Sequence, residues 1–492
     1  MILLVSCNKN PIQTTPSNSD KVVNINIIEM NDIHGHVEQD ASKRSGISNA
    51  SYLIEQIRNE DKADNTILIG NGDMLQETAI SRVSYGEVVI SAMNQMKFDC
   101  MGIGNHEFDW GFDRFLQYFD GDETNGEANF PLLNANVYYK DQLLTIENKV
   151  TSSILLEKED VKVGVISYIG DVYSSINANM TENYTFKAKP NQIADSVLTE
   201  GKALKDKGAD IIIVNIHGGN ADDIKEYDAN NLIADLKYKE NYLVDAVING
   251  HTHTKQDGKI KRTGGADLPV VQSSGKLADF GRIDLTYNLN TKKVEKSQIR
   301  HIDVNSTAKY TMEVENIIQD YYQRSKDVLE EVYCENQVSF YRGDALYEYA
   351  ANLMMTATNT TAAVCNTGAF RNRVDEGPFD FDALYSLNPF DNHIIICEIS
   401  GLNLKKFYDA NANFEFVYTK DYGASIATDQ MYQLAIVDYV YFSNYFAGYR
   451  TDSYMDTELI LRDLMADDLR LRKDKGFNIY KDNKNIEIGS YV

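Results

Sequence analysis

The first half of the chain contains five short hydrophobic runs that are continuous rather than alternating and rich in β-branched residues. Such runs are typical of parallel strands buried on both faces, so helices are expected on both sides of the sheet. Ligands of such sheets gather outside the carboxyl ends of the strands. The pattern predicts an α/β domain whose functional side chains follow the runs Asn24–Met30, Thr66–Gly70, Cys100–Ile103, Ile211–Ile216 and Val244–Ile248.

Each run is followed by side chains of the kinds that bind metals. These side chains are Asp32, His34, Asp73, Asn105, His106, His217, His251 and His253. A mixture of imidazole nitrogen with carboxylate and amide oxygen suits divalent transition metals. Seven of these side chains are too many for one ion, which favours a two-metal site with Asp73 as the bridging carboxylate. The alternative is that each Asp, Asn or His only forms a turn or caps a helix.

These endings resemble the motifs of the calcineurin-like metallophosphoesterases, and within them the bacterial two-domain 5′-nucleotidases, UDP-sugar hydrolases and 2′,3′-cyclic nucleotide phosphodiesterases. The resemblance implies an α/β protein with a four-layer α/β/β/α sandwich, followed by a separate α+β 5′-nucleotidase C-terminal domain. The motifs that carry it are Asn31–Gly35, Gly72–Asp73, Gly104–Asp109, Ile216–Gly219 and Gly250–His253.

The resemblance also implies two divalent metal ions, and the ligand chemistry fits zinc, manganese, iron or cobalt. One ion would be held by Asp32, His34, Asp73 and His253, and the other by Asp73, Asn105, His217 and His251. His106 and Asp109 are implied to be catalytic. A metal-bound water that ionises near neutral pH would attack phosphorus, while His106 stabilises the phosphate oxygens or protonates the leaving group and Asp109 orients the imidazole. The alternative for His106 is a supporting hydrogen bond only.

The length of 492 residues suggests more than one domain. The segment 306–333 is polar with a helical period and is interpreted as a connecting helix. The alternative is a helix packed in the core of one domain. The expected division is a signal remnant and tether at 1–20, a metallophosphatase domain at 21–305, the connecting helix at 306–333 and a substrate-binding domain at 334–492.

Two segments of the second half resemble the substrate loops of the same family. In the Asn366–Arg371 segment, Asn366 and Arg371 are implied to contact a nucleotide. In the Leu387–Asn392 segment, Phe390 is implied to stack on the base and Asn392 to bond its edge. Stacking is a common use of an aromatic ring in base recognition. The alternative for Phe390 is a core position, because most aromatic side chains are buried.

The second half also departs from the family pattern. Thr367 and Ala369 replace two glycines of the first loop, and a glycine-rich segment is absent after Tyr439. These differences leave the substrate open. Further substrate contacts are expected from Arg342 or Arg373, which are otherwise surface charges, and a second stacking ring from Phe442, Tyr445 or Phe446.

The formal net charge of −25 makes a nucleic acid polymer or an anionic membrane surface an unfavourable partner. A small nucleotide or phosphoester remains compatible, since two cations and a few arginines create a local positive site. The expected function is a dimetal phosphohydrolase of 5′-nucleotidase type that releases phosphate from nucleotides. The alternatives are a UDP-sugar pyrophosphatase, a 2′,3′-cyclic nucleotide phosphodiesterase or a surface-binding protein without catalysis.

The first seven residues, Met1–Cys7, resemble the end of a bacterial lipoprotein signal, and the polar stretch Asn8–Ser19 resembles a tether. We therefore expect an extracytoplasmic protein at the cell surface or in the periplasm, attached to the membrane only through a lipid on Cys7. The alternative is an untargeted cytosolic protein. The four other cysteines are expected to be buried free thiols, with one oxidised pair as the alternative.

Overall fold

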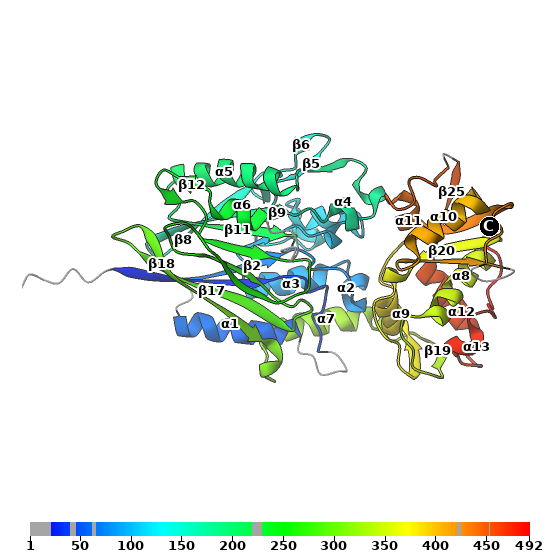
Figure 1. The fold of residues 1–492 in the computed structure, drawn as a ribbon. Helices are drawn as coiled ribbons and strands as arrows, with labels where there is room; N and C mark the ends of the chain where they lie inside the picture. Colours follow the sequence, from blue (N-terminus) through cyan, green and yellow to red (C-terminus); the bar gives the residue numbers. More distant parts are fainter. Residues whose placement is uncertain (1–20, 40–45, 62–64, 219–228, 421–424, 452) are drawn as a thin grey trace, which may run out of the picture.

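The computed structural model describes residues 21–39, 46–61, 65–218, 229–420, 425–451 and 453–492. The lipoprotein signal and the tether expected at 1–20 lie outside these residues. The chain forms two lobes, one built up to α7 (Met312–Leu329) and the other from β19 (Val332–Asn336) onward (Figure 1).

Two sheets form the centre of the first lobe. The first has seven strands in the order β18-β17-β1-β2-β3-β4-β7 and the second six in the order β15-β16-β14-β11-β9-β8. The first sheet consists of β1 (Val22–Met30), β2 (Thr66–Asn71), β3 (Cys100–Gly102), β4 (Leu132–Leu133), β7 (Val150–Thr151), β17 (Asp279–Asn288) and β18 (Lys293–Asp303). The second consists of β8 (Ser153–Lys158), β9 (Val161–Ile169), β11 (Ile211–His217), β14 (Ala246–Asn249), β15 (Gln256–Ile260) and β16 (Leu268–Gln272). The strands that precede the metal-type residues are parallel to their neighbours, namely β1 to β2, β2 to β3 and β11 to β14.

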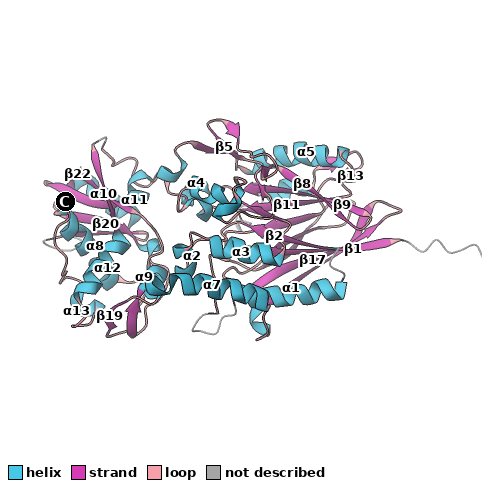
Figure 2. Cartoon of the chain, turned by 180° about the vertical axis from the view of Figure 1, so that it is seen from behind, coloured by secondary structure: helices cyan, strands magenta, loops and turns pink. Residues whose placement is uncertain are grey.

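The two sheets face each other and helices cover both outer faces (Figure 2). Along β1, Ile25 and Ile27 point into the core between the sheets, whereas Ile28 and Met30 point toward the helices. The helices on the first sheet are α1 (Ile47–Asp61), α3 (Glu87–Met96) and α7, and those on the second are α5 (Pro190–Asp206) and α6 (Ala229–Ala234). This arrangement confirms the predicted four-layer α/β/β/α sandwich.

Helix α7 packs along the first lobe against α1, α2 (Ala79–Val83) and α3, and also contacts α9 (Phe381–Leu387) of the second lobe. Its side chains Val314, Ile318 and Tyr321 are buried in the same core as α1 and α3. The helix therefore contributes to the first core while it leads the chain into the second lobe.

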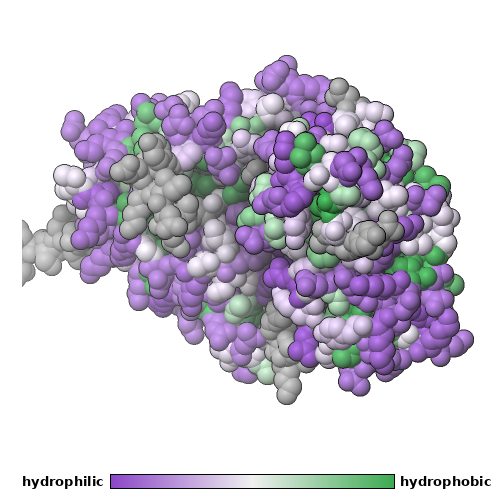
Figure 3. Space-filling model, turned by 45° about the vertical axis from the view of Figure 1, so that its right-hand side comes forward, coloured by the Kyte–Doolittle hydropathy of each residue, from purple (hydrophilic) through white to green (hydrophobic). Residues whose placement is uncertain are grey.

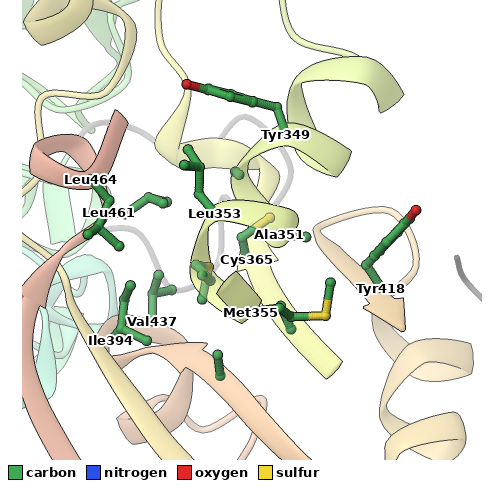
Figure 4. Close-up of a cluster of buried hydrophobic side chains, with 14 of the residues drawn as sticks. Tyr349, Ala351, Leu353, Met355, Cys365, Ile394, Tyr418, Val437, Leu461 and Leu464 are labelled. Carbon is green, nitrogen blue, oxygen red and sulfur yellow. The ribbon is translucent and has the colours of Figure 1, made fainter. Parts of the chain in front are cut away.

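The second lobe contains a mixed five-stranded sheet in the order β23-β20-β24-β22-β25 and a separate pair, β19 and β21 (Gly377–Asp380). The five strands are β20 (Ala362–Asn366), β22 (His393–Ser400), β23 (Glu415–Thr419), β24 (Met431–Val437) and β25 (Tyr454–Ile460). Its helices are α8 (Asp344–Thr358), α9, α10 (Gly401–Asn411), α11 (Asp438–Phe442), α12 (Leu461–Leu471) and α13 (Ile479–Asp482). Leu353 of α8, Val437 of β24 and Leu464 of α12 lie in one hydrophobic core (Figure 4). This confirms a separate α+β unit.

The smaller elements of the first lobe decorate the sandwich. They are α4 (Phe112–Leu116), β5 (Val137–Tyr139), β6 (Gln142–Leu143), β10 (Tyr184–Phe186), β12 (Lys237–Tyr238) and β13 (Asn241–Tyr242), with 3-10 turns at His106–Phe108, Gln117–Phe119, Glu123–Asn125, Tyr173–Ser175, Ala178–Thr181 and Val304–Ser306; a further such turn in the second lobe is Thr367–Ala369. The turn at His106–Phe108 begins shortly after β3 ends at Gly102 and contains His106, which the sequence predicts to be catalytic.

Among the described residues, Cys100, Cys334, Cys365 and Cys397 are buried free thiols, as predicted. The face seen in Figure 3 is mostly hydrophilic, with hydrophobic residues scattered over it. None of the helices in the described ranges combines the length and hydrophobicity needed to span a bilayer.

Candidate active site

The seven expected metal ligands come from both sheets of the first lobe and meet where their strands end. Four follow strands of the first sheet: Asp32 and His34 follow β1, Asp73 follows β2 and Asn105 follows β3. The other three belong to the second sheet, where His217 ends β11 while His251 and His253 follow β14. The site is therefore assembled by the packing of one sheet on the other.

Asp32, His34 and His253 form the first cluster. The Nε2 atoms of His34 and His253 lie 2.9 Å apart, and His253 Nε2 lies 3.2 Å from Asp32 Oδ1. Asp32 Oδ1 is buried, with the His253 ring as its polar neighbour. Burial lowers the pKa of His34 to about 3, so this imidazole is neutral. A cation would be bound by the buried carboxylate oxygen and the ring nitrogens together.

Asp73, His217 and His251 form the second cluster, to which Asn105 adds an amide oxygen. His217 Nε2 lies 3.1 Å from Asp73 Oδ2, and His251 Nδ1 lies 2.8 Å from Asn105 Oδ1. Asp73 Oδ2 is also 4.0 Å from His34 Nε2 of the first cluster. Asp73 thus lies between the two clusters, at the position that a bridging carboxylate would occupy.

Backbone carbonyls orient two of the imidazoles. His34 Nδ1 lies 3.0 Å from the carbonyl oxygen of Gln76, and His217 Nδ1 lies 2.6 Å from that of Asn71. An N–H donated from Nδ1 leaves the Nε2 lone pair pointing into the site, which is the usual arrangement behind a metal-binding histidine. The donor set and its support therefore fit two divalent cations.

The ligand loops have a strained backbone. Five of the seven ligands have positive φ angles, with values of 50° at Asp32, 50° at His34, 52° at Asp73, 80° at His251 and 49° at His253. Residues other than glycine rarely adopt this conformation, and it costs free energy that the surrounding contacts must offset. Such strain is concentrated at functional sites.

Two glycines allow the loops after β2 and β3 to approach each other. A Cβ atom on Gly72 would lie 2.4 Å from Gly104 N, and one on Gly104 would lie 2.2 Å from Asp73 Oδ1. The glycines of the two motifs are therefore required by the space around Asp73.

Glu107 holds these loops together, a role that we did not predict although the residue lies within a motif. Its carboxylate accepts hydrogen bonds from the backbone N–H groups of Asp73, Met74 and Gly104 at 2.7–2.8 Å. Burial, together with the charge of Asp73, raises the pKa of Glu107 to about 7. Glu107 thus fixes the backbone of Asp73.

His106 and Asp109 form an imidazole–carboxylate pair at the edge of the clusters. His106 Nδ1 lies 2.7 Å from Asp109 Oδ2, and the backbone N–H of His106 donates to Asp73 Oδ1. Burial disfavours a charged imidazole, but the carboxylates of Asp109 and Asp73 outweigh it and raise the pKa of His106 to about 9. The ring can therefore carry a proton at neutral pH.

A cleft of about 370 Å³ lies between the two lobes and opens onto both clusters. Asn366, Arg371, Phe390, Asn392 and Arg342, all in the second lobe and all predicted as substrate contacts, line it opposite the first-lobe residues His34, His106 and His253. The Phe390 ring centre lies 6.2 Å from that of His106 and 5.1 Å from the Arg371 guanidinium. The second lobe therefore places a ring and a cation next to the catalytic-type histidine.

Other predicted contacts lie elsewhere. Phe446 is fully buried in the second core against Phe407 and Tyr441, and Tyr445 is 56% exposed and does not line the cleft. Phe442 packs on Tyr441 and Tyr454, and Arg373 is an exposed partner of Asp375. The aromatic residue of this segment that lines the cleft is Tyr439, the second residue of α11. The side chains that follow it in the helix, Val440 and Tyr441, are buried in the core.

Three polar contacts between the lobes were not predicted. Gln76 Nε2 donates to the Pro389 carbonyl at 2.8 Å, and Asn177 Nδ2 donates to Asp438 Oδ2 at 2.9 Å. Arg82 pairs with Asp391 at 2.8 Å. These contacts join distant segments, so no local sequence signal could have found them.

Comparison with known proteins gives a match to each lobe. Residues 25–255 match the family described as Calcineurin-like phosphoesterase, and residues 328–443 match 5′-nucleotidase, C-terminal domain. The solved 5′-nucleotidase precursor from Thermus thermophilus superposes with a TM-score of 0.73 at 18% identity, over 92% of this chain and 97% of that one. At this sequence identity, the superposition is evidence only that the two proteins share a fold.

Two curated relatives align with most of the chain. Endonuclease YhcR of Bacillus subtilis (strain 168) is 26% identical over 443 residues, which is 84% of this chain and 34% of that protein. Protein UshA of Yersinia enterocolitica is 25% identical over 445 residues, which is 80% of this chain and 77% of that protein. The chain thus spans about a third of the first relative and three quarters of the second. Both lobes and their motifs place the chain among the calcineurin-like phosphoesterases that carry a 5′-nucleotidase C-terminal domain.

Proposed function

We propose that the protein is a dimetal phosphohydrolase that releases phosphate from nucleotides. The observation that carries this proposal is that two clusters of metal-ligand side chains and the His106–Asp109 pair open into one cleft with Arg371 and Phe390 of the other lobe. Metal ligands alone would suit many reactions. The cation and the ring across the cleft favour a phosphate ester that carries an aromatic group.

Each group has a distinct task in this proposal. Two divalent cations, when bound by Asp32, His34, Asp73, Asn105, His217, His251 and His253, would activate water and neutralise phosphate charge. His106 donates a proton to the leaving oxygen or stabilises charge on the phosphate, and Asp109 keeps the imidazole charged and oriented. Arg371 binds the phosphate with its planar guanidinium. Phe390 provides a stacking surface for the base, and Asn366 and Asn392 contact its polar atoms.

Two observations indicate which type of nucleotide is the substrate: the family match of the second lobe and the residues that line the cleft. The match to a 5′-nucleotidase C-terminal domain favours nucleoside 5′-monophosphates, which we propose as the substrate. A UDP-sugar or a 2′,3′-cyclic nucleotide is the second candidate, because Arg342 and Lys276 both line the cleft and can contact a further anionic group. The metal identity is proposed from donor chemistry as zinc, manganese, iron or cobalt.

We propose the division of the chain into residues 21–305, 306–333 and 334–492, preceded by a tether at 1–20. The helix α7 lies within the middle segment, and the family matches at 25–255 and 328–443 lie on either side of most of it. An extracytoplasmic location with a lipid on Cys7 is proposed from the sequence of residues 1–20.

Hydrolysis of AMP, UMP, UDP-glucose, 2′,3′-cyclic AMP and p-nitrophenyl phosphate tests the proposal, with added manganese and beside a chelated sample. Phosphate is measured for the monoesters, UMP for UDP-glucose and the ring-opened AMP for the cyclic diester. Asp73→Asn removes the bridging carboxylate, and Asp257→Asn, an exposed carboxylate on β15, is the matched control. We expect metal-dependent release from one nucleotide class that is lost only in Asp73→Asn. Cleavage of p-nitrophenyl phosphate alone would contradict the nucleotide assignment, and no turnover on any compound would contradict catalysis.

A further inference from the structure

Glu415 is a buried carboxyl group with an unpaired oxygen atom. It is the first residue of β23, is only 5% exposed, and its Oε2 atom has no hydrogen-bond partner among the described residues. Burial alone raises the pKa of this carboxyl to about 8. An unpaired carboxyl inside a protein is destabilising, so the fold itself gives no reason for an acid at this position.

The neighbour of Glu415 on the next strand is Asn366. The two residues are directly opposite in the antiparallel pair of β20 and β23, so their side chains project from the same face of the sheet with Cβ atoms about 4.5–5.5 Å apart. Asn366 lines the cleft, and its Oδ1 atom is likewise buried without a hydrogen-bond partner in the described part of the chain. The unpaired oxygen of Asn366 therefore lies at the cleft wall, and the Glu415 carboxyl lies beside it, behind the lining. Glu415 is also near Tyr439, a lining residue whose pKa is raised by burial and, among other groups, by the charge of Glu415.

Unpaired buried polar atoms in pairs point to a ligand rather than to packing. Residues that are unfavourable for folding, such as a buried polar atom without a partner, are found mainly at functional sites. There the loss of stability is offset by a gain in binding. An amide oxygen and a carboxylate are both acceptors, so their complement is a group with two adjacent N–H or O–H donors. Within a nucleotide, the N1–H and N2–H₂ edge of guanine and the 2′,3′-diol of ribose both have this pattern.

We propose that Glu415 is a specificity-determining residue that, together with Asn366, binds two adjacent hydrogen-bond donors on the nucleoside part of the substrate. This inference rests on the proposed nucleotide hydrolase function. The carboxyl is neutral in the unliganded protein, but two donors on a ligand favour its ionised form. A hydrogen bond to a charged group is worth about ten- to hundredfold in affinity. Glu415→Gln keeps the shape but replaces one acceptor with an N–H₂ donor, which opposes a donor on the ligand.

The kinetic test compares GMP, AMP, their 2′-deoxy forms and p-nitrophenyl phosphate, in the wild-type protein, Glu415→Gln and the control Glu398→Gln. Glu398 is an exposed residue on β22 of the same sheet. We expect Glu415→Gln to lower kcat/KM for the preferred nucleotide about ten- to hundredfold relative to p-nitrophenyl phosphate, which has no nucleoside. Lost discrimination between GMP and AMP identifies the base edge, and lost discrimination between ribose and deoxyribose identifies the diol.

An activity-independent measurement uses Trp110, the only tryptophan in the sequence, which lines the cleft. Its fluorescence reports the binding of guanosine, adenosine and 2′-deoxyguanosine, which carry no phosphate to be released. The inference predicts weaker nucleoside binding in Glu415→Gln with an unchanged or higher Tm. Equal nucleoside affinities in wild type and Glu415→Gln, or a loss that is the same for every substrate, would overturn it. Nucleoside binding without turnover of any nucleotide would instead contradict the proposed function.

Discussion

Arg82 Nη2 of α2 lies 2.8 Å from Asp391 Oδ2, so an ion pair connects the first lobe to the loop that carries Phe390. Both side chains are mostly buried, at 18% and 19% exposure, and Arg462 of α12 bonds the other carboxylate oxygen of Asp391. The position of the proposed stacking ring is thereby tied to the metal-bearing lobe.

Breaking this ion pair should therefore reduce catalysis without removing a reacting group. We expect Arg82→Ala and Asp391→Asn each to lower kcat/KM for a nucleotide, and the two changes to be non-additive with a coupling of about 0.5–3 kcal/mol. A double-mutant cycle measures this coupling. Arg324→Ala, which breaks an exposed pair with Asp320, is the control and should have little effect. Additive effects of Arg82→Ala and Asp391→Asn would show that the pair does not act as a unit.

Gly104→Ala should displace Asp73, the proposed bridging carboxylate. The new Cβ atom would lie 2.2 Å from Asp73 Oδ1 and 2.4 Å from Asp73 N, so Asp73 has to shift, although its N–H is held by Glu107. We expect a loss of bound metal and of activity, measured by elemental analysis and phosphate release. Gly258→Ala is the control, since a Cβ atom there would meet nothing within 4 Å. Full metal content in Gly104→Ala would contradict the steric argument.

His106→Ala should slow the chemical step while the metals remain bound. Loss of a positioned proton donor lowers kcat by about 10²–10⁴-fold, and Asp109→Asn should lower it less because the imidazole stays in place. The comparison variant is His301→Gln, which breaks a similar 2.6 Å pair with Asp279 away from the cleft. That change should lower Tm but not the kcat of the folded protein. A kcat near wild type in His106→Ala would exclude His106 from proton transfer.

Removal of metal should destabilise the first lobe. Asp32 and Asp73 are buried carboxylates, so a bound cation would stabilise the folded state. A ligand that binds only the folded state stabilises it by about 2.7 kcal/mol when its concentration is a hundred times its Kd. We expect a chelator to lower Tm and added manganese or zinc to restore it, with a much smaller shift in Asp73→Asn. An identical Tm with metal and with chelator would argue against occupied sites.

Glu415 should give the stability a specific dependence on pH. The folded pKa of about 8 exceeds the ordinary value of 4.5, so the folded state binds the extra proton between these values. The contribution of this group to stability is complete below about pH 4.5 and is lost as pH rises toward about 8. The difference in Tm between Glu415→Gln and wild type should therefore grow over this range. A difference that does not change with pH would show that the carboxyl is not buried as a neutral group.

The strands and the positions of the metal-type side chains after them could be predicted from the sequence because both depend on local pattern. Buried parallel strands produce continuous hydrophobic runs, and the residues after them have to be polar when a site lies at their ends. The motif glycines at 72 and 104 also belong to the local pattern, because only glycine fits where the two loops approach each other.

The predictions were less accurate in the second lobe, where tertiary packing decides which aromatic side chain faces the cleft. The segment after β24 is rich in aromatic residues, and the sequence analysis named Phe442, Tyr445 and Phe446 as candidates but not Tyr439. The start of α11 at Asp438 decides between them, because the helix sends Val440 and Tyr441 into the core. The Arg82–Asp391 pair joins residues from different lobes, and such contacts leave no local pattern.

Because the metal-type side chains come from two sheets, the site can form only late in the synthesis of the chain. A chain that has emerged only as far as Asn105 can form part of the first sheet with Asp32, His34 and Asp73, but it lacks all three ligands of the second sheet. With the proposed ligand assignment, neither ion could then be fully held, so premature metal capture by a nascent chain would be disfavoured. Metal loading would be a late step that follows docking of the sheets, and a misfolded chain would remain inactive.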